Sequence, residues 1–179
     1  MMPIGPLMRE HRLIERMIKI MSKRLDIMEQ QNKADIDFID TATDFIKNYA
    51  DKRHHGKEED ILFRDLGNKP LSAEDKRIIN ELINEHVMGR NNVKKLVRAK
   101  GKYAHGERNA LKDIVETMGI LVTFYPKHIE KEDKHFFIPC MDYFTKSERD
   151  KMLYEGKEFD KRLDQVDYEK VVEQLERQN

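Results

Sequence analysis

The sequence predicts an all-α protein: an up-down-up-down four-helix bundle, built as a pseudo-twofold repeat of one helix pair and followed by short C-terminal helices. Long stretches are rich in Glu, Lys, Arg, Leu, Ile and Met, which favour helices, and Gly and Pro are scarce inside them. No alternation of apolar and polar residues with period two persists, as strands would require. The 179 residues include 39% hydrophobic residues, ten Met and no Trp, which suits a thin core between amphipathic helices.

Apolar spacing and end signals predict the first two helices. In residues 7–29, apolar side chains recur at three-, four- and seven-residue steps, which places them on one helix face. The second helix is expected over residues 35–66. It ends where Gly67 and Asn68 tolerate a left-handed cap and Pro70 cannot continue the helical hydrogen bonds.

The third and fourth helices have comparable limits. Ser72, with Asp75 three positions later, is predicted to cap the third helix, which ends near residue 101. The fourth is expected over residues 107–137, before Pro139. Four long helices joined by short connections form an up-down-up-down bundle.

The chain is expected to divide into a bundle of residues 1–140 and a helical extension of residues 141–179 that packs on it. Thr145 and Glu148 form a capping box at the start of the extension. Its later part is weakly amphipathic, which suits docking on the bundle or on another protein. The protein partner is left unidentified.

Charge and cysteine content exclude several classes of function. The 34 Lys+Arg residues balance 34 Asp+Glu residues and the two signs are interspersed, which argues against nucleic-acid binding. No apolar run approaches the roughly 20 residues of a membrane-spanning helix, and the N-terminus lacks a signal pattern. We therefore expect a cytoplasmic protein without a membrane partner. The single cysteine, Cys140, cannot form a thiolate cluster and is expected to be inert.

Four of the seven histidines fall one to each predicted core helix. Those on the second and fourth helices begin matched segments, with Lys at +3, Glu at +4, an acid at +5 and Phe at +9. Corresponding histidines are separated by 86 − 11 = 75 and 128 − 54 = 74 residues, so the helix pair is repeated. The residues that this repeat places together are His11, His54, Glu58, His86, His128 and Glu132.

Helical geometry directs these six side chains into the core. At about 100° per residue, positions i and i+4 share a face, whereas Glu59 and Asp133, at i+5, point about 140° away and are expected in solvent. Ionised carboxylates in an apolar core are costly unless they are protonated or meet a cation. A pair of divalent metals bridged by Glu58 and Glu132 is therefore predicted. Nitrogen and carboxylate donors suit iron, zinc or manganese, and incomplete coordination leaves positions for a small ligand.

These motifs resemble the hemerythrin-like (HHE cation-binding) domain family. The resemblance covers roughly residues 7–138. It implies a non-haem di-iron centre with an oxo or hydroxo bridge, inside a four-helix bundle that binds dioxygen, nitric oxide or peroxide, or senses iron or redox state. The motifs that carry it are Glu10-His11-Arg12, His54-x-x-x-Glu58, Glu85-His86 and His128-x-x-x-Glu132.

The sequence departs from the oxygen-carrying members of this family at two positions. Their second histidine on the third helix is replaced here by Arg90, which cannot ligate a metal. Those members use an aspartate at +5 on the fourth helix, whereas here Glu132, at +4, is the carboxylate that better faces the core. One iron is therefore expected to lose a nitrogen donor, which disfavours reversible oxygen carriage. Glu15, at the position equivalent to Arg90 on the first helix, is expected either to substitute as a ligand or to pair with Arg90.

Three histidines and Tyr125 lie outside these assignments. His135 returns to the face of His128 and is a candidate for the outer coordination sphere. Tyr125 lies one turn before His128. It is expected to pack in the core, and the alternative is that it lines the ligand pocket. His55 and His105 are expected on the surface.

Three functions compete. The leading one is a di-iron protein that binds or senses dioxygen, nitric oxide, peroxide or iron status. The second is an enzyme that decomposes peroxide or reduces nitric oxide, although the sequence identifies no catalytic acid or base outside the metal ligands. The third is a zinc-bound structural or partner-binding module. A ferritin-like oxidase is disfavoured because that bundle uses the order Glu-x-x-His.

Overall fold

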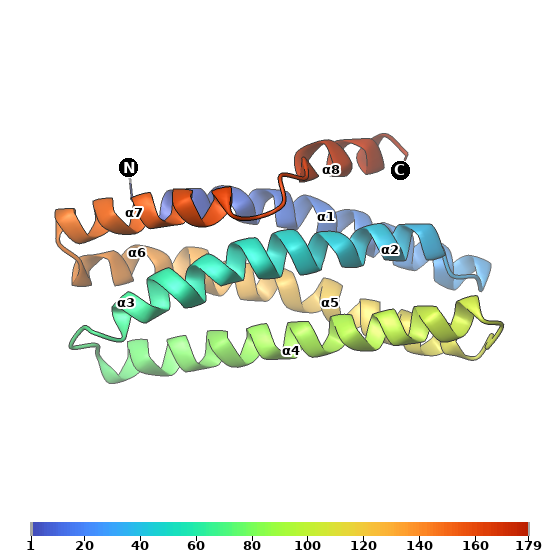
Figure 1. Ribbon diagram of the computed structural model, residues 1–179. Coiled ribbons are helices and arrows are strands. Elements are labelled where there is room, and N and C mark those ends of the chain that lie inside the picture. Colours follow the sequence, from blue (N-terminus) through green and yellow to red (C-terminus); the bar gives the residue numbers. More distant parts are fainter. Residues whose placement is uncertain (1, 179) are drawn as a thin grey trace.

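The computed structural model describes residues 2–178, which fold into helices joined by short turns. Four long helical rods run side by side, and two further helices lie along the outside of the bundle (Figure 1). The rods are α1 (Ile4–Gln31); α2 (Ile36–Phe45) with η1 (Ile46–His55), η2 (Glu58–Phe63) and α3 (Arg64–Leu66); α4 (Ala73–Ala104); and α5 (Ala110–Lys131) with η3 (Glu132–Phe136) and α6 (Phe137–Cys140). The turn η4 (Met141–Tyr143) leads to α7 (Lys146–Lys161) and α8 (Tyr168–Arg177). The predicted all-α bundle is confirmed.

Side-chain caps set the helix limits much as the sequence indicates. Ser72 accepts a hydrogen bond from the backbone N–H of Asp75, and Thr145 forms the expected capping box with Glu148. The second rod ends as expected at Leu66 but without a left-handed cap, because Gly67 has φ −58°. The fourth rod continues past its expected end to Cys140. Pro139 is tolerated there because it lies within the first turn of the short helix α6, where its missing N–H has no partner to lose.

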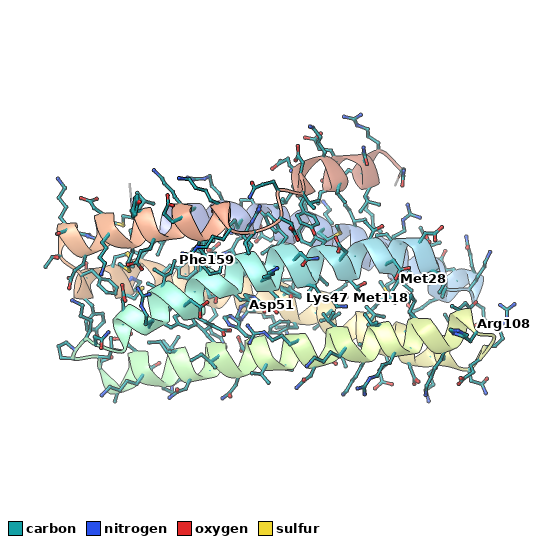
Figure 2. The ribbon with its side chains drawn as sticks, in the orientation of Figure 1. Met28, Lys47, Asp51, Arg108, Met118 and Phe159 are labelled. Atoms are coloured by element: carbon teal, nitrogen blue, oxygen red, sulfur yellow. The ribbon has the colours of Figure 1, made fainter. Side chains whose placement is uncertain are left out.

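The interior of the bundle has two apolar clusters separated by a polar layer. One cluster contains Met28 and Met118, which lie toward one end of the bundle (Figure 2). The other contains Leu7 and Phe137. In the first three rods the buried histidines and glutamates fall between the residues of these two clusters, and in the fourth rod His128 and Glu132 flank Ile129, the last residue of that rod in the first cluster. The polar layer is therefore shielded on both sides.

Three segments of the rods are π-helical: η1 and η2 in the second rod and η3 in the fourth. In a π-helix the hydrogen bonds run from i to i+5, so the turn is wider and each residue rotates by less than the about 100° of an α-helix. All three segments lie where the polar layer crosses the second and fourth rods. Side chains that an α-helix would spread around its surface are therefore brought closer to one face.

The two C-terminal helices pack on different parts of the bundle. Met152 of α7 belongs to the apolar cluster that contains Leu62 of η2. Tyr168, at the start of α8, packs edge-on against Phe45 and donates a hydrogen bond to Asp44 at 2.8 Å. Within residues 2–178, no helix combines the length and apolarity that a membrane crossing needs.

Candidate metal centre

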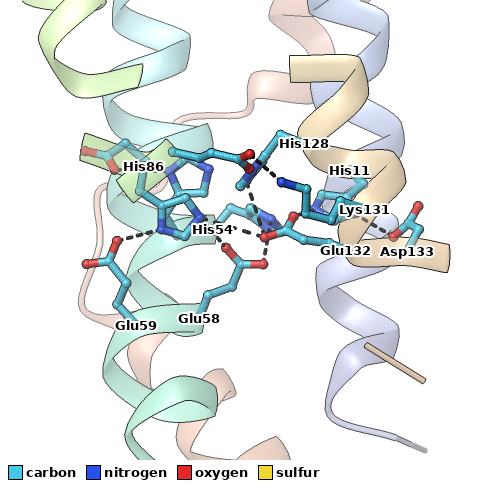
Figure 3. Close-up of polar contacts among 12 residues, drawn as sticks. His11, His54, Glu58, Glu59, His86, His128, Lys131, Glu132 and Asp133 are labelled. Atoms are coloured by element: carbon cyan, nitrogen blue, oxygen red, sulfur yellow. Dashed lines mark hydrogen bonds and ion pairs between the residues drawn. The ribbon is translucent and has the colours of Figure 1, made fainter. Parts of the chain in front are cut away.

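The buried side chains of the polar layer form two clusters with the donor atoms of a metal site. In each cluster, one donor atom from every residue lies within 4.8 Å of the others. Because Glu58 belongs to both clusters, the two sites adjoin (Figure 3). Site A consists of His11, His54, Glu58 and Glu132, and site B consists of His55, Glu58, His86 and His128.

The carboxylates of Glu58 and Glu132 lie between the imidazoles of the two sites. Glu58 approaches His54 Nε2 with one oxygen and His86 Nε2 with the other, at 3.4 Å each. Glu132 likewise approaches His11 Nε2 at 3.1 Å and His128 Nε2 at 3.3 Å. Each carboxylate thus spans both sites, as a ligand that bridges two ions would.

The atoms that face the middle of the layer have no hydrogen-bond partner among the described residues. They are the Nε2 atoms of four histidines and both carboxylate oxygens of Glu58 and Glu132. Their nitrogen–oxygen distances are short, but the angles are not those of hydrogen bonds. Buried polar atoms without partners are rare and costly in proteins, so this inward-facing set calls for a ligand. The four histidines are His11, His54, His86 and His128.

The opposite nitrogen of every imidazole in the layer is held by a carboxylate. An ionised carboxylate can only accept, so each Nδ1 carries the proton and each Nε2 is left free to ligate a metal. This arrangement, carboxylate to histidine to metal, is how proteins orient imidazole ligands. The Nδ1–oxygen pairs are His11–Asp133 (2.7 Å), His54–Glu10 (3.0 Å), His55–Asp51 (3.2 Å), His86–Glu59 (2.7 Å) and His128–Glu85 (2.7 Å).

A basic residue backs each of these orienting carboxylates. Arg90 donates to Asp51 at 2.8 Å and to Glu59 at 2.7 Å. Such pairing places a positive charge beside each carboxylate and fixes it in place. The remaining pairs are Arg12–Asp133, Lys57–Glu10 and Lys131–Glu85.

These outer contacts explain the sequence repeat. Glu10 precedes the histidine of the first rod and accepts a hydrogen bond from His54 of the second rod, and Lys57, at +3 from His54, pairs with Glu10. In the same way, Glu85 of the third rod accepts from His128 of the fourth rod, and Lys131 pairs with Glu85. The acid at +5, Glu59 or Asp133, holds the histidine of the first or third rod. The repeated positions therefore encode two copies of one imidazole-orienting network, related by the pseudo-twofold.

Charge in the layer is balanced by protons on the imidazoles. Burial disfavours the charged form of His54, but the charge of Glu58 and the contact with Glu10 outweigh it and raise the pKa to about 10. Burial likewise opposes the charge on His86, but its contacts with Glu132 and Glu59 raise the pKa to about 9. Burial would raise the pKa of Glu132, yet the surrounding imidazoles hold it well below its usual value. A metal ion would take the place of these protons.

The expectation for His55 is wrong. Its side chain is not on the surface; the residue is 2% exposed and belongs to site B. His55 ends the π-helical segment η1, where the smaller rotation per residue lets adjacent histidines both turn inward. Burial and the neighbouring imidazoles lower its pKa well below the usual value, so it is a neutral imidazole suited to ligation. The adjacent histidines His54 and His55 are the sequence signal for this donor, but an α-helical rotation of about 100° per residue places them on different faces.

The expectation that Glu59 and Asp133 point into solvent is also wrong. Each is partly buried and holds an imidazole of the layer. Both lie in π-helical segments, so position i+5 is rotated less far from the histidine than in an α-helix. By contrast, His105 is exposed as expected.

Of Glu15, Arg90, Tyr125 and His135, only Tyr125 and Arg90 adjoin the site. Arg90 pairs with Asp51 and Glu59, and the ring of Tyr125 is buried 6.4 Å from that of His55. Glu15 is corrected: its side chain is 41% exposed and pairs with Arg12 at 3.3 Å, so it neither reaches the clusters nor meets Arg90. His135 is exposed because η3 turns it away from the layer, which removes it from the outer coordination sphere.

The donors present fit a bimetallic centre. Five imidazoles and two carboxylates face one buried layer, and among the described residues the inward atoms of both carboxylates and of four of the imidazoles have no hydrogen-bond partner. Arg90 cannot supply a nitrogen ligand, but His55 supplies a nitrogen donor to site B from the second rod. Nitrogen and oxygen donors without thiolate are those that iron, zinc and manganese accept.

Comparison with known proteins agrees with this geometry. The family model of the hemerythrin HHE cation-binding domain matches residues 2–137. No curated protein and no solved structure gives a significant match. The matched segment contains all four rods up to the start of α6 and every donor of sites A and B. The chain therefore belongs to the hemerythrin HHE family of cation-binding domains.

Proposed function

We propose that the protein holds two iron ions at sites A and B and binds or senses a small molecule, namely dioxygen, nitric oxide or peroxide, or reports iron status. The observation that carries the proposal is the pair of adjoining clusters that share Glu58. Iron bound there would supply redox chemistry and coordination positions for a small ligand. His11 and His54 would hold one ion, His55, His86 and His128 the other, and Glu58 and Glu132 would lie between them.

The surroundings of the layer support a small ligand rather than a large substrate. A cavity of about 160 Å³ is lined by His55, Tyr125, Asp51 and Arg90, among others. Its volume holds several water molecules, a diatomic gas or a molecule about the size of benzene, but no large substrate.

Anaerobic loading with Fe(II), followed by air, tests the proposal. We expect two irons per chain by elemental analysis, and a near-ultraviolet absorption band that appears on oxidation. Glu58→Ala, which removes the donor shared by both sites, should abolish the band and lower the iron content. Tight binding of zinc with no uptake of iron would overturn the proposal in favour of a structural zinc module.

The same sample separates a binding protein from an enzyme. Added peroxide or nitric oxide that is bound stoichiometrically, with a spectral change and no turnover, supports the proposal. Sustained turnover that depends on Glu58 would instead assign the protein to the enzymes that decompose peroxide or reduce nitric oxide.

A further inference from the structure

The C-terminal helix α7 makes direct contact with the network that orients His54. Asp160, at the end of α7, lies 2.9 Å and 3.1 Å from Lys57 Nζ through its two carboxylate oxygens, and 3.9 Å from Arg53. Lys57 is only 5% exposed and pairs with Glu10, which in turn accepts the Nδ1 proton of His54. An unbroken series of charged contacts therefore joins α7 to a donor of site A.

The pseudo-twofold shows what Asp160 contributes. In the other half of the bundle, Lys131 backs Glu85 and meets a second carboxylate, that of Glu81. Because the first and third rods are related by 75 residues, the counterpart of Glu81 is residue 81 − 75 = 6, which is Pro6. Pro6 has no carboxylate, yet it lines the same small cavity as Lys57 and Asp160. Asp160 thus supplies from α7 the charge that the rod itself supplies in the other half.

A second contact binds α7 to the same segment. Phe159 packs so closely on Gly56 that a Cβ at residue 56 would lie 2.8 Å from the Phe159 ring. Gly56 stands between His55 and Lys57, so adjacent residues of α7 touch adjacent residues of the segment that carries the ligands. Figure 2 shows Phe159 at the side of α7 that faces this rod. The counterpart of Gly56 in the other half, residue 56 + 74 = 130, is the exposed Glu130.

We propose that α7 is coupled to the metal centre, with Asp160 as a positioning residue that acts on His54 through Lys57 and Glu10. Metal at site A then favours the docked position of α7, and docked α7 favours metal at site A, because coupling between two sites is reciprocal. The family match ends at residue 137, so this coupling is a property of the extension in this chain. The inference rests on the proposed metal centre.

Two-step titration with Co(II) under anaerobic conditions tests the first half of the coupling. Asp160→Asn should weaken one of the two Co(II) sites by about 3- to 10-fold, less than the 10- to 100-fold for residues that touch a ligand directly, and leave the other unchanged. Asp150→Asn, an exposed carboxylate on the same helix, is the matched control. Pro6→Glu in the Asp160→Asn background places a carboxylate at the counterpart of Glu81 and should restore the affinity.

Hydrogen exchange on the wild-type protein tests the second half without any variant. Co(II) should slow exchange in residues 146–161 (α7) by about fivefold or more, and by more than in residues 168–177 (α8), which pack away from the centre. Equal Co(II) affinities for Asp160→Asn and Asp150→Asn, together with equal protection of α7 and α8, would overturn the coupling. Failure of the wild type to bind Co(II) would instead overturn the proposed metal centre itself.

Discussion

The imidazole rings of His55 and His86 lie stacked, with centroids 3.9 Å apart and planes inclined by 12°. They come from different rods, η1 and α4, and both hold their Nδ1 protons against carboxylates that Arg90 secures. One arginine therefore orients two donors of site B. The counterpart of His55 in the other half, residue 55 + 74 = 129, is Ile129, so site A lacks this third imidazole and the two sites are inequivalent.

Replacing His55 with isoleucine, the residue at its counterpart, should selectively weaken site B. The variant loses a donor, so the loss of affinity should exceed the roughly 10- to 100-fold that outer contacts cost. Co(II) titration monitored by visible absorption measures both sites. His135→Ile, which alters an exposed histidine, is the control. Two unchanged Co(II) sites in His55→Ile would show that His55 is not a ligand.

Arg90→Gln should weaken site B through the imidazoles that Arg90 helps to orient. The substitution leaves Asp51 and Glu59 without their basic partner, and both pair with histidines of site B. We expect about 10-fold weaker Co(II) binding at site B, with site A little affected. Arg98→Gln changes an exposed arginine on the same helix and should have no effect. Equal losses at both sites would argue for a general distortion of the bundle.

Metal should stabilise the bundle strongly. The inward atoms of the layer have no partners of their own among the described residues. At free metal 100 times the Kd, each site should add about 2.7 kcal/mol to the free energy of unfolding, which raises the Tm by about 5–10 °C in a chain of this size. Calorimetry before and after treatment with a chelator measures this shift. Glu58→Ala should lose most of it, because both sites share Glu58; an undiminished shift would contradict that sharing.

The start of α7 should be sensitive to acid. The hydrogen bond from Lys69, followed by those from the backbone and hydroxyl of Thr145, lowers the pKa of Glu148 to about 2. A carboxyl whose folded pKa is depressed stabilises the fold above its ordinary pKa of 4.5, and this contribution is lost as the pH falls from about 4.5 to about 2. Denaturant unfolding of wild type and Glu148→Gln should therefore differ at pH 6 and converge near pH 2. A difference that persists at pH 2 would contradict this origin.

Much of the fold follows from local features of the sequence. The caps at Ser72 and Thr145 and the stop after Leu66 depend on residues a few positions apart, so sequence alone predicts them. The six residues His11, His54, Glu58, His86, His128 and Glu132 are also predictable, because the repeat fixes their spacing and an i to i+4 pair shares one helix face. The structure brings all six into one layer.

The remaining parts of the site depend on contacts between distant segments. The π-helical segments turn His55, Glu59 and Asp133 toward the layer, which an α-helical rotation of about 100° per residue does not predict. The pairing of Arg90 was misjudged because helical spacing places a residue on a face but does not identify what lies opposite.

The sequence by itself determined the four long rods, their order and the donor types at the centre, since these depend on periodicity and on chemistry carried within single segments. Only the tertiary structure decided which carboxylate orients each imidazole, and that α7 reaches the centre through Asp160 and Lys57, residues 103 positions apart. The physical reason is that a hydrogen bond needs two groups within about 3 Å and an ion pair within about 4 Å, and for groups on different rods that distance is set by packing.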